Sequence, residues 1–450
     1  MALFGSAGSF ATCFNRAEDG GLTVMNIFFL AAIAILGGLA IDVANVVSAR
    51  TQLQVAADTA AHAALVEREW HSAQDAKDKA LAVAAQNMPQ ELFGDVLTQQ
   101  NITFGDYDRE TGQFTADVNS RNAVLVTTER LTRNGNPVTT FLLQFVGLWD
   151  WNVRTSAVFE TFIPTCLIEG FVAESVIDIQ SNNSYFNGFC LHSNSHVTIN
   201  NNNFFESGTV VSMPDTTDMV VNITGNGEDR NEGLEDALRE GKWFIKILNR
   251  IDLIAAGLQD RHSRYARDYT NNFNVIQIDV DMPSLRQGNK YVIEPSDLQK
   301  GRVYKISCNK VDLVNKGSGV FDGIVLIADC PVEVSGGLKF KDTVILTTYA
   351  GGNAFKSPAN IVLGEDDGCA AGGGVQFIAK GDIDFSAGIE LYGSQIIAGG
   401  DVEFTSNANG LQGASIVAGG RIDSTSNMNF SFCGSGMEHS FLAEYFRLAK

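Results

Sequence analysis

The sequence of 450 residues has few prolines and few basic residues. The first shortage restricts the structural class of the chain, and the second restricts its partners. Its 8 prolines against 44 glycines exclude a collagen-like chain and a proline-rich disordered chain. Lys and Arg total 32 against 52 Asp and Glu, so the net charge is -20. An acidic surface of this kind repels phosphate backbones, and nucleic acid is therefore not expected as a partner.

Charge is absent from residues 22–41, where Leu, Ile, Phe, Val and Ala dominate. About 20 helical residues with a rise of roughly 1.5 Å each span the ~30 Å hydrocarbon core of a bilayer. A cleaved signal peptide and a buried core helix are the alternatives. Because the apolar part of a signal peptide is usually only about 7–15 residues long, the run favours an uncleaved transmembrane helix after a short segment of residues 1–21.

Familiar catalytic motifs are also missing. The chain has no Gly-x-Ser-x-Gly elbow, no phosphate-binding Gly-x-x-x-x-Gly-Lys loop and no Cys-x-x-Cys pair. His192 and His196 lie near Cys190, but their spacing outside a helix favours solvated turn histidines over zinc ligands. The acidic run at 365–367 favours a solvated loop over a calcium site. No catalytic, cofactor or metal residue is therefore predicted.

The seven cysteines divide into one before the hydrophobic segment, Cys13, and six after it. An even number on the larger side fits an oxidising compartment and up to three disulfides. Buried free thiols are the alternative, and the spacing leaves the pairing open. The six candidates are Cys166, Cys190, Cys308, Cys330, Cys369 and Cys433.

The helical pattern continues past the hydrophobic segment. Small and apolar residues recur on one stripe between residues 43 and 65, and Pro89 ends the pattern. This predicts one long helix that leaves the membrane with an Ala-rich face. Small side chains allow close approach, so the face suits either a partner helix or the chain's own next domain, and the second is favoured.

A characteristic series of residues flanks the hydrophobic segment. An acidic-Gly pair precedes it, and an Arg-x-x-Leu-Gln-x-Ala-x-Asp-x-Ala-Ala pattern follows it at residues 50–61. This series resembles the signature of the TadE/TadG-like Flp pilus-assembly proteins of bacterial tight-adherence (Tad) systems, and the likeness covers residues 15–165. The matching residues are Asp19, Gly20, Arg50, Leu53, Gln54, Ala56, Asp58 and Ala60.

The resemblance implies a single-pass protein of the bacterial inner membrane with its C-terminal bulk in the periplasm. Its implied partners, besides the membrane, are other Tad pilus-assembly proteins or pilin-like subunits. Pilin-like members that a prepilin peptidase cuts carry a Glu where this chain has Asn26, which favours a retained TadG-like anchor.

Residues 101–163 alternate apolar and polar side chains with a period of two. Strands are expected at 102–107, 114–118, 123–128 and 138–146, forming a small antiparallel sheet packed on the helix. The fold class predicted for residues 42–165 is therefore α+β.

The second half of the chain repeats at intervals of about twenty residues. Residues 378–385, 397–404 and 417–424 share one pattern, and 177–183 matches 197–203. Short Val/Ile strands separated by Gly and Asn at this period predict a parallel β-helix, or solenoid, over residues 166–450, with an ordinary β-sandwich as the alternative. A helical insertion is expected at about 233–260, and the amphipathic tail at 441–448 is expected to cap the open end of the stack.

Carboxylates recur in register on the predicted outer face of the repeats. Stacked acids of this kind can form the cleft of a glycan lyase or hydrolase. Surface charge that prevents edge-on pairing is the favoured interpretation. The residues are Asp382, Asp384, Asp401, Glu403 and Asp423.

The sequence thus favours a non-enzymatic, membrane-anchored accessory protein for assembly of Flp/Tad-type pili, which presents a rigid β-solenoid as an interaction surface and uses no cofactor. A membrane-tethered carbohydrate-active β-helix enzyme and a surface glycan-binding adhesin are the alternatives.

Overall fold

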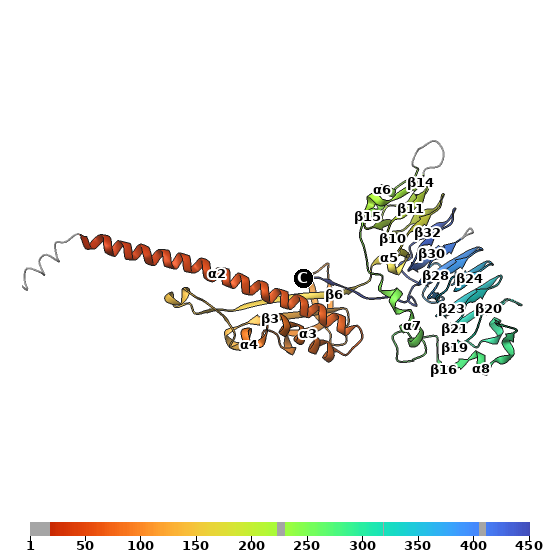
Figure 1. The fold of residues 1–450 in the computed structure, drawn as a ribbon, viewed down its shortest axis with the longest axis horizontal. Helices are drawn as coiled ribbons and strands as arrows, with labels where there is room; N and C mark the ends of the chain where they lie inside the picture. The colour runs from red at the N-terminus through yellow and green to blue at the C-terminus, as the bar shows by residue number, and fades with distance from the viewer. Residues whose placement is uncertain (1–18, 223–229, 318, 405–410) are drawn as a thin grey trace, which may run out of the picture. The chain divides into compact units, whose positions relative to one another are not determined.

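The computed structural model describes residues 19–222, 230–317, 319–404 and 411–450, so Cys13 and most of the predicted N-terminal segment 1–21 lie outside the described residues. The chain forms two compact units (Figure 1). The first comprises Met1–Phe162 together with Glu444–Lys450, and the second comprises Ile163–Ala443. In sequence, the second unit is therefore inserted between two parts of the first.

The first unit is built on α2 (Asp19–Arg68), a helix of 50 residues. The prediction that this helix continues to Pro89 is wrong, because a capping box starts a separate helix, α3 (Ala73–Asn87). The N–H of Asp75 donates to Ser72 Oγ at 3.2 Å, and the N–H of Ser72 donates to Asp75 Oδ2 at 3.1 Å. The chain turns back there, and α3 packs along α2.

The Ala-rich face of α2 is buried within the first unit. It contacts α3 and the strands β3 (Ala123–Arg130) and β6 (Val153–Phe162). This confirms the favoured expectation that the face packs against the chain's own next domain, and it leaves no room there for a partner helix. The α2 residues in the hydrophobic core of this unit are Ala49, Leu53, Ala56, Ala57, Ala60, Ala61, Ala64 and Leu65, and those of α3 are Ala76, Ala80 and Ala84.

The expected antiparallel sheet is present. In the described part of the chain it has five strands in the order β2-β1-β3-β6-β33, with β1 (Ile102–Asp108), β2 (Gln113–Ala116) and β33 (Tyr445–Leu448). The predicted cap at the C-terminal tail is wrong, because β33 pairs antiparallel with β6, placing Leu448 opposite Phe159. The smaller elements are α4 (Gln90–Phe93), η1 (Gln99–Asn101) and η2 (Thr132–Asn134).

The strand predicted at 138–146 is also wrong. Only β4 (Val138–Thr139) forms there, and it pairs with β5 (Asp150–Trp151) in a two-stranded ribbon. The apolar residues that follow β4 instead form a loop that contains the short helix η3 (Leu143–Val146).

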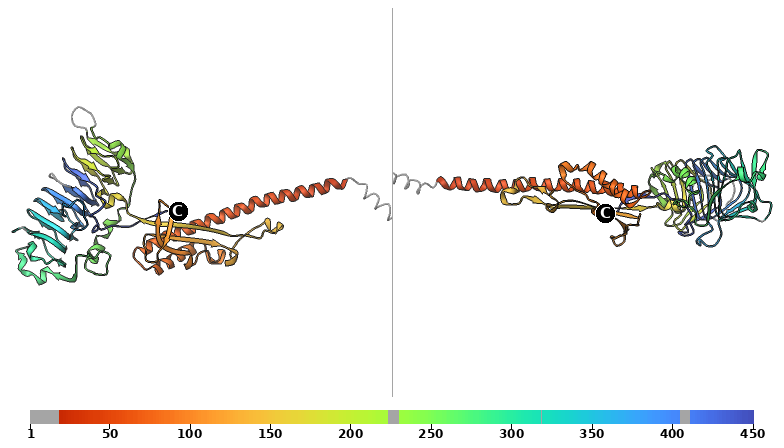
Figure 2. Two further views of the ribbon diagram at one scale, coloured as in Figure 1. Left: turned by 180° about the vertical axis from the view of Figure 1, so that it is seen from behind. Right: turned by 90° about the horizontal axis from the view of Figure 1, so that it is seen from below.

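The second unit consists mainly of short parallel strands in two large sheets, seen from two further directions in Figure 2. Among the described residues, one sheet has 15 strands and contains the path β15-β13-β10-β7-β30-β28-β25-β23-β21-β19-β16. The other has 11 strands in the order β14-β11-β8-β31-β29-β27-β24-β22-β20-β18-β17. A large, mostly parallel strand region thus follows the long apolar helix, as the repeats predict.

The strands of the 15-stranded sheet are β7 (Gly170–Ala173), β9 (Ser184–Phe186), β10 (Cys190–Ser193), β12 (Phe204–Phe205), β13 (Val210–Met213), β15 (Leu238–Glu240), β16 (Asn272–Gln277), β19 (Arg302–Ile306), β21 (Val320–Ala328), β23 (Leu338–Thr347), β25 (Ile361–Leu363), β26 (Val375–Ala379), β28 (Ile389–Ala398), β30 (Leu411–Ala418) and β32 (Asn429–Ser431). Those of the 11-stranded sheet are β8 (Ile177–Ile179), β11 (Val197–Asn200), β14 (Val220–Asn222), β17 (Arg286–Gln287), β18 (Lys290–Ile293), β20 (Val311–Leu313), β22 (Val332–Val334), β24 (Phe355–Ser357), β27 (Ile383–Phe385), β29 (Val402–Phe404) and β31 (Ile422–Asp423). The short helices are α5 (Thr165–Ile168), η4 (Thr216–Asp218), α6 (Leu234–Ala237), η5 (Lys246–Arg250), α7 (Ile251–Gly257), α8 (Ile278–Asp281), η6 (Pro283–Leu285) and η7 (Pro295–Asp297).

The sequence repeats coincide with strand pairing. Cys190 lies opposite both Gly170 and Val210, each twenty residues away along the chain. The glycines of the repeat are required by close backbone approach. A Cβ on Gly419 would lie 2.3 Å from the carbonyl oxygen of Gly399, and a Cβ on Gly420 would lie 1.8 Å from a carboxylate oxygen of Asp401.

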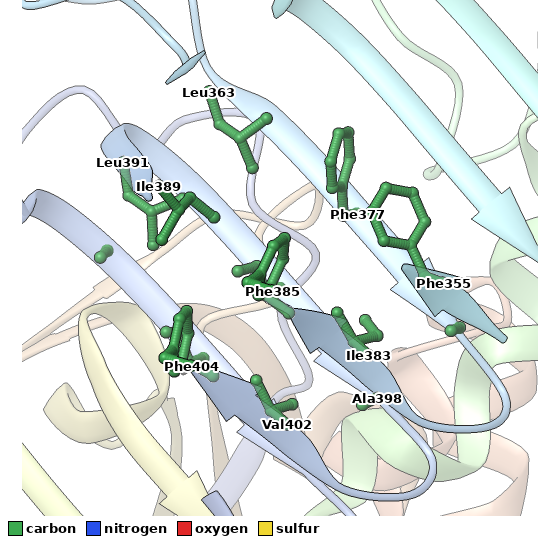
Figure 3. Packing of buried hydrophobic residues seen from close by; sticks show 14 of the residues in the cluster. Phe355, Leu363, Phe377, Ile383, Phe385, Ile389, Leu391, Ala398, Val402 and Phe404 are labelled. Carbon is green, nitrogen blue, oxygen red and sulfur yellow. The ribbon is translucent and has the colours of Figure 1, made fainter. Parts of the chain in front are cut away.

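Apolar side chains from successive strands stack inside the second unit (Figure 3). The rings of Phe355 and Phe377 have centroids 4.5 Å apart, and those of Phe385 and Phe404 stack at 5.3 Å. The inner face of each strand is therefore buried by side chains of the neighbouring strands in the stack.

The order of the strands in space differs from their order in the chain. β7, the first strand of the unit, pairs in parallel with β30, so that Gly170 lies opposite Ser415. The strands from β7 to β15 thus continue the stack beyond the strands from β16 to β30. The spatial order of the strands is therefore a circular permutation of their order in the chain. The chain enters the unit at Ile163, just before β7, and leaves it at Ala443, after β30 and β32, so its first and last strands lie in the interior of the stack rather than at its ends.

A connecting segment of residues 241–271 joins the two ends of this stack. Near its start, the N–H of Gly241 donates to the carbonyl of Met213 at 2.9 Å, and at its end the N–H of Asn271 donates to the carbonyl of Gly301 at 3.2 Å. Within the range expected to form a helical insertion, about 233–260, the structure has α6, η5 and α7 together with strand β15.

Candidate functional site

The first half of α2 is left uncovered by the rest of the described chain. The helix is long and apolar enough to cross a membrane, and it is the one such helix found in the described residues. Phe28 is 72% exposed and Leu36 is 68% exposed. Between residues 22 and 42, Gly38 and Asp42 are the only described positions that are buried. Such a surface is costly in water and stable in hydrocarbon.

Asp42, directly after the apolar run, holds the loop of residues 140–149, which we call the membrane-proximal loop. Its carboxylate accepts hydrogen bonds from the backbone N–H groups of Phe141 at 2.5 Å, Leu142 at 3.0 Å and Leu143 at 2.7 Å. One turn further along α2, the amide of Asn45 donates to the carbonyl of Thr139 at 3.1 Å. The sequence analysis missed this site, although an acidic residue at the end of an apolar helix is the signal that could have found it.

The family-signature residues join α2 to the sheet. Leu53, Ala56 and Ala60 are fully buried, whereas Arg50 is exposed. The amide of Gln54 donates to Asp58 Oδ1 at 2.8 Å and to the carbonyl of Ser156 at 3.2 Å. Asp19 and Gly20 lie at the start of α2. The pattern at residues 50–61 therefore serves the packing of the unit, and its side chains do not converge on a reaction centre.

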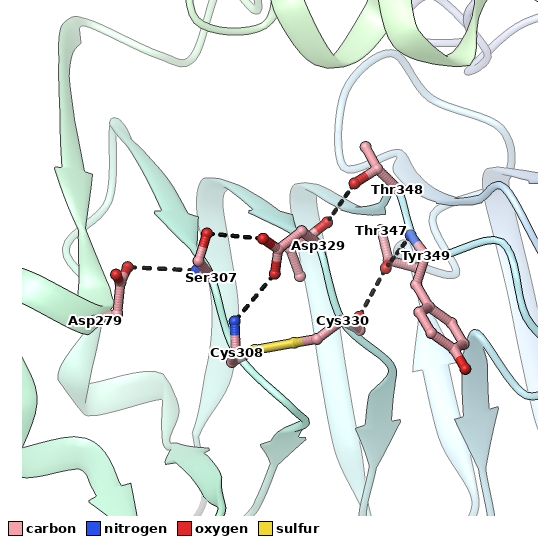
Figure 4. The surroundings of a disulfide bond; sticks show 9 residues. Asp279, Ser307, Cys308, Asp329, Cys330, Thr347, Thr348 and Tyr349 are labelled. Atoms are coloured by element: carbon pink, nitrogen blue, oxygen red, sulfur yellow. Dashed lines mark hydrogen bonds between the residues drawn. A yellow bond between two sulfur atoms is a disulfide. The ribbon is translucent and has the colours of Figure 1, made fainter.

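The six candidate cysteines form three disulfides, all in the second unit. The pairs are Cys166–Cys190, Cys308–Cys330 and Cys369–Cys433. Figure 4 shows that Asp329 lies beside the second pair, where it accepts from Ser307 Oγ at 2.7 Å and from the N–H of Cys308 at 3.0 Å.

The third disulfide lies near the junction at which β7, the first strand of the unit, pairs with β30. The carboxylate of Glu169, just before β7, accepts from the N–H groups of Cys433 and Gly434, both at 2.6 Å. Burial raises the pKa of Glu169, and the two backbone hydrogen bonds oppose that rise. The hydrogen bonds of Glu169 thus join the start of the unit to the segment that follows β32, beside the third disulfide.

The recurrent carboxylates have backbone and ionic partners. Asp382 accepts from the N–H of Asp401 at 2.9 Å, and Asp401 accepts from the N–H of Arg421 at 2.8 Å. Asp384 lies 3.2 Å from Lys356 Nζ, and Asp423 pairs with Arg421. Asp384 stands opposite Glu403, which stands opposite Asp423. These acids form a ladder along the 11-stranded sheet in which hydrogen bonds connect successive turns of the chain.

The two histidines considered as zinc ligands have different surroundings, and the expectation of a solvated turn histidine is wrong for His192, which lies in strand β10. His192 is buried, its ring nitrogens lie 2.7 Å from Ser212 Oγ and 3.0 Å from Asn194 Oδ1, and its ring stacks on Trp243 with centroids 4.1 Å apart. Cys190 is disulfide-bonded, and His196 is half-buried beside Ser195. The structure does not bring these three residues into one ligand set.

A groove of about 490 Å³ crosses the 15-stranded sheet and includes part of the acidic loop at 365–367. Tyr392 and Glu390 line it beside Glu365 and Asp366, and Glu365 is paired with Lys341 at 2.6 Å. An aromatic ring among carboxylates is a surface on which a sugar can stack and form hydrogen bonds.

Three family models match the chain. The Tad model, described as Flp pilus-assembly TadE/G-like, matches residues 20–86, which cover all but the first residue of α2 and the last residue of α3. The Tad_C model, described as Tad-like Flp pilus-assembly, matches residues 59–158. The resemblance noted in the sequence is thereby confirmed. A third model, Domain of unknown function (DUF7867), matches residues 170–434, more than half of the chain and nearly all of the second unit.

Comparison with individual proteins adds little. None of the curated proteins matches the chain. The crystal structure of the competence-associated pilin ComZ from Thermus thermophilus is similar over 78% of this chain and 87% of its own, at 10% identity and a TM-score of 0.26. A TM-score this low does not carry a fold or a function from one protein to the other.

Proposed function

The chain belongs to the DUF7867 family and is TadE/G-like at its N-terminal end, and on that premise we propose that it is a membrane-anchored accessory protein for the assembly of Flp/Tad-type pili. The observation that carries the proposal is the uncovered apolar half of α2 within the region that the Tad model matches. In this proposal α2 is a single transmembrane anchor, and the folded units act outside the hydrocarbon.

The second unit serves, in this proposal, as a rigid β-solenoid that presents an interaction surface. Support comes from the register of its strands, from the stacked phenylalanines and from the carboxylate ladder. A stack that is closed by long-range strand pairing and reinforced by disulfides keeps its outer faces fixed, as a scaffold for other proteins requires. Its partners are then other Tad assembly proteins or pilin-like subunits.

The proposed location is the bacterial inner membrane, with the C-terminal bulk in the periplasm. Three disulfides in the second unit support this orientation, because disulfides persist in oxidising compartments and are rare in the cytosol. The part of the first unit that follows the apolar run has no further candidate membrane span among the described residues, so in this proposal it lies on the same side.

A non-enzymatic role is part of the proposal. It is supported by Asp382 and Asp401, because each carboxylate accepts a hydrogen bond from the backbone of the next repeat and so stabilises the stacking of the repeats. The groove around Tyr392 favours one alternative, a glycan-binding or glycan-cleaving surface. That alternative predicts binding or cleavage of an oligosaccharide by purified protein, and loss of both in Tyr392→Ala.

The decisive experiment is a clean gene deletion complemented with wild-type and altered genes. We expect Flp pili to disappear in the deletion strain, to return with the wild-type gene and to remain absent when residues 22–41 are deleted. Normal piliation without the gene would overturn the role in assembly.

Two further measurements test the anchor and its orientation. The full-length protein should stay in the membrane pellet after washing with alkaline carbonate, and alkaline phosphatase fused after Lys450 should be active. Release by carbonate would contradict the anchor, and an inactive fusion in stably expressed protein would contradict the orientation.

A further inference from the structure

The membrane-proximal loop presents large apolar side chains that the rest of the described chain does not cover. Residues 138–149 contain no charged residue. Phe145 is 88% exposed and Trp149 is 64% exposed. The others are Phe141, Leu142, Val146 and Leu148.

The loop lies at the end of the apolar run of α2. Its backbone is hydrogen-bonded to Asp42, the first charged residue after residues 22–41. Gly38 leaves the space that Leu142 uses, since a Cβ at that glycine would lie 2.7 Å from Leu142 Cβ. Between these two contact positions, Leu39 and Ile41 of α2 are 44% and 52% exposed. In Figure 1 the loop is part of the yellow segment beside the middle of α2.

The backbone of the loop is hydrogen-bonded within the unit. Besides the three N–H groups held by Asp42, the N–H of Thr140 donates to the carbonyl of Trp149 at 3.1 Å, and the N–H of Leu148 donates to the carbonyl of Leu143 at 3.1 Å. Non-helical backbone can approach hydrocarbon only when its polar groups are paired in this way. The loop meets that condition over most of its length.

We propose that the membrane-proximal loop is a second membrane contact, a wedge that enters the lipid leaflet nearest the first folded unit beside α2. This inference rests on the proposed membrane anchor. A lipid surface is favoured as the occupant because the loop is continuous with the lipid-facing part of α2 and lies at the depth where aromatic side chains gather at membrane interfaces. Since Asp42 ties the loop to the helix, the wedge fixes both the depth of α2 and its rotation about its axis.

Trp149 allows a direct test. The chain has four tryptophans, so a Trp149-only variant carries Trp70→Phe, Trp151→Phe and Trp243→Phe. The matched control keeps only Trp70, which is 43% exposed and lies just after Arg68, the C-terminal residue of α2. Full-length protein is placed in vesicles of phosphatidylcholine and phosphatidylglycerol, with part of the lipid brominated near the headgroup.

Most of the Trp149 emission should be lost on bromination, whereas the Trp70 emission should be unchanged. If Trp149 is not quenched while the protein floats with the vesicles, the anchor stands and the wedge is wrong. Equal quenching of the two tryptophans would also overturn the wedge. Protein that does not float with the vesicles would remove both the anchor and the wedge.

A second test works in native membranes and does not alter any tryptophan. Phe145, which is almost fully exposed, is replaced by p-benzoylphenylalanine, and Val118 is replaced in a control. Val118 is 64% exposed, but its carbonyl accepts from Arg68 at the far end of α2. Illumination should give a lipid adduct at position 145 and none at position 118. A protein adduct in place of lipid at 145 would show that a partner covers the loop and would overturn the proposal.

Discussion

Phe385 in the second unit is 1% exposed, whereas Phe28 in the first unit is 72% exposed, although both lie in regular secondary structure. The second unit buries its phenylalanines between neighbouring strands, so its core is complete within the protein. The first unit buries only the Ala-rich half of α2 and leaves the other half uncovered. The comparison shows that the second unit is stabilised by contacts between its own repeats, whereas the apolar half of α2 has no such cover within the described chain.

The cysteines divide between the units in the same way. All three disulfides of the described chain lie in Ile163–Ala443. The sheet of the first unit is held instead by α2, α3 and the final strand β33. In the proposed function, the disulfides of the second unit therefore fit an oxidising compartment, and the uncovered half of α2 in the first unit fits a membrane.

Reduction should have the largest effect and should act on one unit. In the chain-entropy model each disulfide that closes 22 or 24 residues contributes about 3 kcal/mol, and the one that closes 64 residues contributes about 4 kcal/mol. We expect dithiothreitol to lower the urea midpoint of the second unit, read in a variant that retains only Trp243, and to leave the midpoint of the first unit, read in a variant that retains only Trp70, unchanged. Equal destabilisation of both units would break the comparison.

Truncating one phenylalanine in each unit should give the next largest difference. Phe385→Ala removes a ring that stacks on Phe404, and a fully buried Phe→Ala change costs about 3–5 kcal/mol. Phe28→Ala removes a ring that touches little of the protein, so the unfolding free energy of the purified protein in detergent should be nearly unchanged. Denaturation of both variants measures the difference, and a large loss in Phe28→Ala would show that α2 is covered by protein.

The features that the sequence predicted are those that local patterns encode. A run without charge predicts the apolar half of α2, and repeats of about twenty residues predict strands in register, as seen at Gly170, Cys190 and Val210. The break before α3 was also visible in principle, because Ser72 and Asp75 have the spacing of a capping box.

The features that it did not predict depend on contacts between distant residues. Nothing local shows that β7 pairs with β30 or that β33 joins the sheet beside β6. The apolar run after β4 was interpreted as a strand because apolar content alone does not distinguish a buried strand from an exposed loop. The contact that decides between them, Asp42 with the loop backbone, links residues about one hundred positions apart.

A substitution in the Ala-rich face tests how tightly the first unit is packed. Ala60 is fully buried between α2, α3 and the sheet, so Ala60→Leu adds volume where none is free. Overpacking of this kind costs about 1–3 kcal/mol. Val55→Leu, at a half-exposed position of the same helix, is the matched control. In a background that retains only Trp70, the urea midpoint should fall in Ala60→Leu and not in Val55→Leu. An unchanged midpoint in Ala60→Leu would mean that the face has room for a larger side chain.

The smallest effect expected is a pH dependence in the second unit that originates at His192. Burial lowers the pKa of this histidine, although its hydrogen bond with Asn194 and the charge of Glu174 partly oppose that change. As the pH falls, His192 therefore takes up a proton in the unfolded chain at a higher pH than in the folded protein. The folded state keeps its full stability above about pH 6.5 and loses stability as the pH falls toward the pKa of His192 in the folded protein. Each unit of depression costs about 1.4 kcal/mol. In a variant that retains only Trp243, the urea midpoint should fall more steeply between neutral and acidic pH with both histidines present, or with His196→Gln added, than with His192→Gln added. Equal slopes in all three proteins would exclude His192 as the origin.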